Sequence, residues 1–187
     1  MPPVSRILEL GSGTGLLGMV VSKLGNPKCV ILTDGDGEAV GLLEKNLSSP
    51  NNRIDQQTTK AKFLRWGEDR QMEDFSTWCH LSWPDAFPIA AEFDHIIAGD
   101  VMYKEELPPI FFATSFKFLK HDGVLWLCHI PRANVGHELV VACAEKFGFR
   151  FDHVPTSHIA IENIPIEDIE RAKVYRLTKI GSNVRLG

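Results

Sequence analysis

Short apolar runs alternate along the chain with segments whose apolar residues recur every three or four positions. Unbroken apolar runs are typical of strands buried on both faces, and amphipathic segments between them are typical of helices that connect parallel strands. The apolar runs predict strands at 7–10, 29–33, 62–64, 93–98, 124–129, 149–154 and 172–178. The amphipathic segments predict helices at 16–24, 38–46, 105–119 and 134–147. Five strand–helix units followed by two closely spaced strands describe a doubly wound α/β sheet.

Three segments lack a clear period. Residues 48–59 are polar and contain Pro50, which predicts a loop. Residues 69–92 hold tryptophans and prolines without regular spacing, which predicts a long insertion or an irregular helix. Residues 164–171 are expected to be irregular as well. No internal repeat or low-complexity segment divides the chain, so a single domain is expected over 1–187.

The first predicted strand runs directly into a glycine turn and then into a helix. Glycines allow positive φ and a close approach of a ligand to the main chain, and the following helix start presents unpaired N–H groups. Residues 13–18 satisfy the dinucleotide spacing G-x-G-x-x-G. However, Glu9 stands two residues before the first glycine, where a carboxylate would repel a pyrophosphate but accept hydrogen bonds from an amine-bearing cation. A turn without a ligand is the alternative. The predicted cofactor-binding residues in this stretch are Glu9, Gly11, Ser12, Gly13, Thr14 and Gly15.

The pattern E-x-G-x-G-x-G from Glu9 to Gly15 resembles motif I of the Rossmann-like, S-adenosylmethionine-dependent methyltransferases. The resemblance implies S-adenosyl-L-methionine as the cofactor and S-adenosyl-L-homocysteine as the product. It also implies a seven-stranded sheet in the order 3-2-1-4-5-7-6, with strand 7 antiparallel and helices on both faces. The same resemblance implies an N-terminal segment over the cofactor. Because the motif I strand begins within six residues of Met1, that segment is expected to be missing, which leaves a minimal domain.

Two acidic residues follow the second predicted strand. Asp34 ends this strand about twenty residues beyond the glycine turn, where one carboxylate can accept hydrogen bonds from both hydroxyls of a ribose. Asp36 is the reserve for this role, and it could equally cap the helix that follows. Gly35, between them, is assigned to the same site.

Candidate residues also follow the third and fourth strands. Trp66 could stack on an adenine or belong to the core. Ligands in a doubly wound sheet sit at the carboxyl ends of the strands, so Glu9, Asp34, Trp66 and Asp100 are expected to share one rim. Gly99, at the end of the fourth strand, is included among the cofactor-binding residues.

The sequence Asp100-Val101-Met102-Tyr103 resembles the Asp-x-x-Tyr motif of the seven-stranded protein-lysine methyltransferases, the methyltransferase-like and calmodulin-lysine type. The resemblance implies a protein-lysine acceptor. Asp100 and Tyr103 are the predicted catalytic residues: Asp100 would orient the target ammonium, and Tyr103 would line its channel. Another protein side chain or a small molecule is the alternative methyl acceptor. A protein that binds the cofactor but has no activity is the alternative to an enzyme. A nicotinamide dehydrogenase fits poorly, because Glu9 opposes it and no Tyr-x-x-x-Lys pair is present.

The other motifs in the sequence bear on the substrate, on metal binding and on nucleic-acid binding. Residues 129–132, His-Ile-Pro-Arg, could face the substrate or simply turn the loop after the fifth strand. The seven histidines lack metal-ligand spacing, so no metal centre is predicted. No Asn-Pro-Pro-Tyr motif follows the fourth strand, and a net charge of −4 gives no basic field for nucleic acid. We therefore expect a protein substrate, no nucleic-acid or membrane partner, and a monomer.

Cysteine usage indicates the compartment. The four cysteines lie far apart and form no C-x-x-C pair, and three of them sit in apolar runs that favour reduced, buried thiols. No secretory signal precedes the first strand, and no apolar run is long enough to span a membrane. A cytoplasmic protein is expected, with the nucleus as the alternative location.

Overall fold

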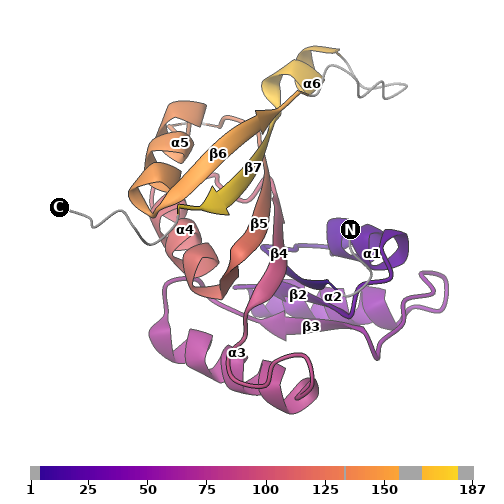
Figure 1. Ribbon diagram of the computed structural model, residues 1–187. Coiled ribbons are helices and arrows are strands. Elements are labelled where there is room, and N and C mark those ends of the chain that lie inside the picture. Colours follow the sequence, from indigo (N-terminus) through magenta and orange to yellow (C-terminus); the bar gives the residue numbers. More distant parts are fainter. Residues whose placement is uncertain (1–4, 133, 156–165, 181–187) are drawn as a thin grey trace.

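The computed structural model describes residues 5–132, 134–155 and 166–180. Its centre is a seven-stranded sheet in the order β3-β2-β1-β4-β5-β7-β6 (Figure 1). The strands are β1 (Arg6–Leu10), β2 (Cys29–Asp34), β3 (Thr59–Phe63), β4 (Phe93–Gly99), β5 (Leu119–His129), β6 (Phe149–Val154) and β7 (Lys173–Lys179). The helices are α1 (Leu16–Leu24), α2 (Gly37–Ser48), α3 (Asp69–Ser82), α4 (Leu107–Phe118), α5 (His137–Lys146) and α6 (Ile166–Arg171).

The topology confirms the predicted fold class. Strand β1 pairs in parallel with β2 and with β4, β2 pairs in parallel with β3, and β4 pairs in parallel with β5. Strand β7 lies antiparallel between β5 and β6. The chain therefore winds away from β1 in both directions, and a doubly wound sheet has its ligand crevice at this switch point, outside the carboxyl ends of the strands.

Alternating side chains of the central strands enter two separate cores. Ile7, Val30 and Leu32 pack with Leu43 and Leu47 of α2 on one face. The neighbouring side chains, such as those of Leu8 and Ile31, face the opposite way into a larger core that includes α3, α4 and α5. Figure 1 shows α1 on one side of the sheet and α4 with α5 on the other. Burial on both faces explains the unbroken apolar runs of these strands.

Helix α3 corrects the prediction for residues 69–92. The segment was expected to be an insertion or an irregular helix, yet Asp69–Ser82 forms fourteen residues of regular helix. Met72, Phe75 and Cys79 recur at helical spacing and are buried in the larger core. Polar residues between them obscure the period in the sequence. Helix α6 likewise replaces the irregular structure expected at 166–171, and positions 164–165 of that prediction lie outside the described residues.

The starts of four elements also differ from the predicted bounds by two residues or more, and one of them is β3, which begins at residue 59 rather than 62. Strand β5 begins at Leu119 rather than 124, because Leu119 pairs with Phe93 and the chain stays in the sheet through Asp122 and Gly123. The register of β4 against β5 shifts between Phe93 and His95, which accommodates this extension. Helices α4 and α5 start at residues 107 and 137, two and three residues later than predicted. Among the described residues, no helix has the length and apolarity needed to cross a bilayer.

A charge cluster ties together the amino-terminal ends of β1, β4 and β5. The Asp94 carboxylate accepts hydrogen bonds from the Arg6 backbone N–H at 2.8 Å and from Lys120 Nζ at 2.6 Å, and it pairs with Arg6 Nε at 3.1 Å. Burial would raise the pKa of Asp94, but the hydrogen bonds from Arg6 and Lys120 outweigh it and lower this pKa to about 2. The ionised carboxylate therefore stabilises the folded state.

We expect Asp94→Asn to lower the free energy of unfolding at pH 7 by about 2 kcal/mol, the equivalent of the lowered pKa. The folded pKa lies below the unfolded one, so this contribution is present above about pH 4 and disappears as the pH falls towards 2. Urea unfolding at pH 7 and pH 3 measures both effects. Asp152→Asn is the matched control, because the pair of Asp152 with Arg176 is largely exposed and should contribute under about 1 kcal/mol. Equal losses in the two variants would contradict the prediction.

Candidate active site

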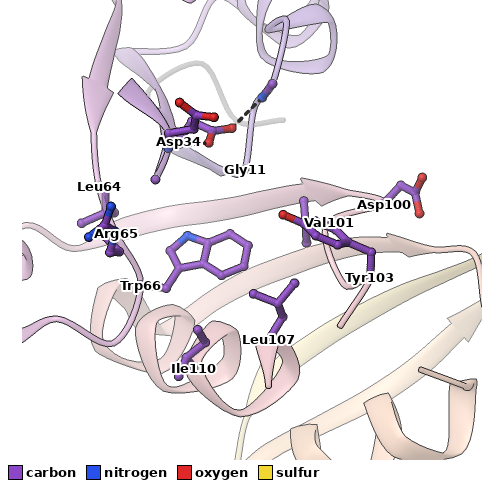
Figure 2. A pocket seen from close by; sticks show the side chains of 13 residues that line it. Gly11, Asp34, Leu64, Arg65, Trp66, Asp100, Val101, Tyr103, Leu107 and Ile110 are labelled. Carbon is purple, nitrogen blue, oxygen red and sulfur yellow. Dashed lines mark hydrogen bonds between the residues drawn. The ribbon is translucent and has the colours of Figure 1, made fainter. Parts of the chain in front are cut away.

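The glycine turn is tied to the end of β2 by its own backbone and by Asp34. The N–H groups of Gly11 and Ser12 both donate to the carbonyl of Thr33 at 2.9 Å. The carboxylate of Asp34 accepts from the Gly13 N–H at 2.9 Å and from the Asp36 N–H at 3.0 Å (Figure 2). Asp34 thus joins the loop after β1 to the turn after β2, and lone pairs on both carboxylate oxygens remain available to a ligand.

Gly11 is the point where three loops approach most closely. Its φ is +75°, and a Cβ at this position would lie 2.7 Å from Val101 Cγ1 and 3.3 Å from the indole of Trp66. Any side chain would therefore push apart the segments after β1, β3 and β4. The close approach requires glycine here on both conformational and steric grounds.

A hollow of about 480 Å³ opens beside this contact (Figure 2). Eight predicted site residues line it: Gly11, Gly13, Asp34, Gly35, Asp36, Trp66, Asp100 and Tyr103. The sequence reasoning missed five further lining residues: Leu64, Arg65, Val101, Leu107 and Ile110. Two signals could have found them, namely the position of Leu64 and Arg65 directly after β3 and the i, i+3 spacing of Leu107 and Ile110 at the start of α4.

A second hollow, of about 380 Å³, lies on the α1 side of the glycine turn. It is lined by Glu9, Ser12, Thr14 and Gly99, and it shares Gly11 with the first hollow. The turn therefore separates two hollows that together contain nearly all the predicted site residues. Gly15 is not among the lining residues of either one, because a Cβ there would meet Leu43 at 2.6 Å and Leu32 at 3.1 Å within the α2 face of the core.

Glu9 is buried beneath the turn, with 3% of its surface exposed. Its carboxylate lies against Gly18 of α1, where an added Cβ would be 2.5 Å from Oε2. Burial raises the pKa of Glu9 to about 7, and the nearby Ser12 hydroxyl and Gly18 N–H lower it by less. A carboxylic acid with this pKa can change its charge near neutral pH when a cation approaches.

Trp66 and Asp36 each make a structural contact and also line the first hollow. The Trp66 ring packs edge-on against Phe111 of the larger core, at 5.2 Å between ring centroids, and it also lines the first hollow. Asp36 caps α2 by accepting the Glu38 N–H at 2.8 Å, and it too lines this hollow.

Asp100 and Tyr103 occupy the far end of the first hollow. Asp100 has a positive φ of 58°, and its N–H donates to the Cys128 carbonyl of β5 at 2.9 Å. Figure 2 shows the Asp100 carboxylate pointing away from the Trp66 indole, whereas the Tyr103 ring extends over the hollow towards it. Oδ2 of Asp100 forms an ion pair with Arg132, a contact that the sequence did not reveal.

Several predicted site residues keep a buried polar atom without a partner. Among the described residues, eight buried side-chain atoms lack a hydrogen-bond partner, and four belong to predicted site residues: Glu9 Oε2, Ser12 Oγ, Trp66 Nε1 and Asp100 Oδ1. The Ser12 hydroxyl lies close enough to the Glu9 carboxylate to lower its pKa, but its geometry is too poor for a hydrogen bond. Buried polar groups in folded proteins are normally satisfied, so each exception requires an explanation. The residues that carry these four atoms all line one of the two hollows.

The comparisons with known proteins decide the family. A family model described as "Lysine methyltransferase" matches residues 3–141. The chain belongs to this family. It is 28% identical over 136 residues to "Protein N-lysine methyltransferase METTL21A" of Xenopus tropicalis, covering 73% of this chain and 54% of that protein. It is 27% identical over 101 residues to "Calmodulin-lysine N-methyltransferase" of Arabidopsis thaliana, covering 54% of this chain and 28% of that protein.

These matches leave part of each relative uncovered, since the chain spans about half the length of the METTL21A protein and less of the calmodulin-lysine enzyme. A longer match, 25% identical over 181 residues, is METTL21A of Danio rerio, covering 97% of this chain and 69% of that protein. The family predicted from the Asp-x-x-Tyr motif is thereby confirmed.

Solved structures agree on the fold of this lysine methyltransferase family member. A TehB-like SAM-dependent methyltransferase from Corynebacterium glutamicum superimposes with a TM-score of 0.64 at 16% identity, covering 96% of this chain and 82% of that one. A putative methyltransferase complexed with SAH gives a TM-score of 0.62 at 12% identity, covering 94% and 46%. At these identities the likeness shows the Rossmann-like methyltransferase fold.

Proposed function

We propose that this chain transfers a methyl group from S-adenosyl-L-methionine to a lysine side chain of a protein. The observation that carries the proposal is the set of four unpartnered buried polar atoms on Glu9, Ser12, Trp66 and Asp100, which line the two hollows beside one glycine turn. Membership of the lysine methyltransferase family supports the choice of reaction.

The residues beside the turn fit the chemistry of this cofactor. Glu9 and the turn from Gly11 to Gly15 would hold the amino-acid end, because a buried carboxylate attracts an ammonium group. Asp34 would hold the ribose hydroxyls, with Gly35 and Asp36 beside it, and Trp66 would hold the adenine. The assignment uses both hollows, and Gly99 would border the amino-acid end in the second one.

The acceptor half of the proposed site is formed by Asp100 and Tyr103. A lysine arrives as an ammonium with a pKa of about 10.4 and must release a proton to water before it can act as a nucleophile. When bound, S-adenosylmethionine supplies the methyl group, which the amine lone pair takes from sulfur as the C–S bond breaks and its electron pair stays on the thioether. Asp100 orients the incoming amine, and Tyr103 forms the wall that directs it towards the first hollow.

The partner and location proposals rest on less specific observations. The names of the relatives describe protein substrates, which favours a protein acceptor for this chain as well. The net charge of −4 gives no general attraction for nucleic acid. We propose a monomer that acts on a protein in the cytoplasm, with the nucleus as the alternative location.

Two linked measurements test this function. Calorimetric titration with S-adenosylhomocysteine should show micromolar binding, and labelled S-adenosylmethionine should then methylate lysine peptides on an array. A matched array with arginine in place of each lysine is the control for acceptor chemistry. No binding of S-adenosylhomocysteine would contradict the cofactor assignment. Binding with no lysine-dependent transfer would favour the alternative of a cofactor-binding protein without activity.

As the pH rises towards about 7, the affinity for S-adenosylhomocysteine should increase roughly tenfold per pH unit, and above pH 7 it should level off. The reason is that Glu9, with a pKa near 7, carries a proton at lower pH that must leave before the carboxylate can pair with the ligand ammonium. The raised pKa also means that the contribution of Glu9 to folding stability falls as the pH rises from about 4.5 to 7. Calorimetry in buffers of different ionisation enthalpy measures the released proton. Glu9→Gln should bind weakly with no such pH dependence, and an unchanged pH profile in this variant would contradict the assignment.

A further inference from the structure

Arg132 is placed beside the proposed acceptor residue by the loop that follows β5. One of its guanidinium nitrogens forms an ion pair with Oδ2 of Asp100, while Oδ1 of Asp100 is buried and has no partner among the described residues. The backbone N–H of Asp100 is also tied to β5, through the Cys128 carbonyl at 2.9 Å. The end of β5 and its loop thus hold Asp100 by both its backbone and its side chain.

The loop itself is fixed to the buried end of β5. The Val135 N–H donates to the Arg132 carbonyl at 2.9 Å, which closes a tight turn. His129, which is fully buried, contacts the Val135 carbonyl at 3.0 Å through Nε2, so this nitrogen carries the proton that it donates. Val135 is buried as well. Val135 therefore links the Arg132 backbone to buried His129 at the end of β5.

This ion pair changes how Asp100 would receive a lysine. A lone carboxylate would stabilise the incoming ammonium and raise its pKa, although only the neutral amine can attack a methyl group. A guanidinium on the same carboxylate weakens this attraction and favours release of the proton to water, and solvent moderates the effect because the Arg132 and Asp100 side chains are 51% and 31% exposed. The pair therefore suits a site that must orient an amine without keeping it charged.

Several other charged groups lie near this pair. Tyr103, Lys104, Glu105 and Glu106 follow Asp100 along the chain and line a hollow of about 340 Å³ beside it. Asp34, Asp36 and Arg65 face it across the first hollow. From β5, burial lowers the pKa of His129, which favours the neutral ring. Within the part of the chain that the structure describes, Arg132 supplies the recorded ion pair to the Asp100 carboxylate.

We propose that Arg132 is a specificity-determining residue whose guanidinium neutralises Asp100, so that the acceptor amine binds as the neutral nucleophile instead of as an ammonium ion. The inference rests on the proposed function and deepens it by assigning a role at the acceptor end of the same site. It predicts that removal of Arg132 makes the site bind an ammonium more tightly and release its proton less readily.

The test uses a probe with an amine in the acceptor position. This probe is an S-adenosylhomocysteine analogue in which nitrogen replaces the sulfur and carries a 3-aminopropyl group. Calorimetry between pH 6 and pH 9 compares the parent chain with Arg132→Gln and Arg132→Lys. We expect Arg132→Gln to bind the analogue roughly tenfold more tightly at pH 7, where the free amine is protonated, since one pKa unit corresponds to a factor of ten. Between pH 7 and pH 9 the parent should gain affinity as the amine loses its proton, and Arg132→Gln should gain less. Arg132→Lys keeps the charge and should behave like the parent.

Titration with S-adenosylhomocysteine, which lacks the amine chain, separates this inference from the function on which it rests. The compound should bind equally to all three proteins and to Arg150→Gln, a control variant at an exposed arginine on β6. Equal affinity of Arg132→Gln and the parent for the amine analogue would overturn the role of Arg132. Loss of S-adenosylhomocysteine binding in Arg132→Gln would overturn it too, by showing a structural role. Failure of the parent to bind S-adenosylhomocysteine would overturn the proposed function and this inference with it.

Discussion

Replacing Asp34 by alanine is expected to weaken S-adenosylhomocysteine binding by two to three orders of magnitude. The substitution removes the two hydrogen bonds that join the glycine turn to the turn after β2, at 2.9 Å and 3.0 Å, and it removes the proposed acceptor for the ribose hydroxyls. Hydrogen bonds to a charged group contribute about 1.5–3 kcal/mol each, and about 1.4 kcal/mol is a factor of ten in affinity. Isothermal titration calorimetry measures the change directly.

Two neighbouring variants separate the contributions of Asp34. Asp34→Asn keeps one carbonyl oxygen that can accept the Gly13 N–H, so its loss of affinity should be roughly ten- to thirtyfold. Asp36→Ala removes the cap of α2, which should lower stability by about 1 kcal/mol while reducing affinity much less. Thermal unfolding of each variant shows whether the fold is retained. Affinity in Asp34→Ala within a few-fold of the parent would remove Asp34 from the proposed cofactor site.

The site residues at the strand ends could be predicted, because the carboxyl ends of neighbouring parallel strands lie at the same edge of the sheet. Asp34 ends β2 and Asp100 follows β4, and both strands lie parallel to β1, so their carboxyl ends meet at the same edge as the glycine turn. The glycine spacing also carried direct information, since Gly11 has both the positive φ and the close contact with Val101 that only glycine permits. Local chemistry and strand topology were sufficient for these residues.

The remaining features depend on tertiary contacts that a single sequence does not record. Arg132 lies on a loop, and its pairing with Asp100 follows from the anchor between His129 and Val135 rather than from any spacing. The regular helix α3 was predicted only as an insertion or an irregular helix, because polar residues separate its three buried positions. The extension of β5 to Leu119 depends on its pairing with Phe93 across the sheet. In each case packing against another element overrides the local pattern.

Asp100→Asn is expected to reduce methyl transfer to lysine peptides about a hundredfold while leaving S-adenosylhomocysteine affinity nearly unchanged, because an acceptor amine that is no longer oriented loses the advantage of alignment. Asparagine is the suitable replacement, since Asp100 has a φ of 58° and asparagine tolerates this left-handed region better than alanine does. Steady-state rates with labelled S-adenosylmethionine, together with calorimetry, separate the acceptor end of the site from the cofactor end. Tyr103→Phe keeps the aromatic wall, so its rate should fall by roughly tenfold or less.

The ion pair between Asp100 and Arg132 gives the lower rate of Asp100→Asn two competing explanations. Removal of the carboxylate leaves the guanidinium without its partner, so part of the lost rate could come from repulsion of the incoming ammonium rather than from lost orientation. The double variant Asp100→Asn with Arg132→Gln removes both charges and tests this directly. If repulsion dominates, the second substitution restores most of the rate; if orientation by Asp100 dominates, the rate stays low. Parent-like transfer by Asp100→Asn alone would contradict the catalytic assignment of this residue.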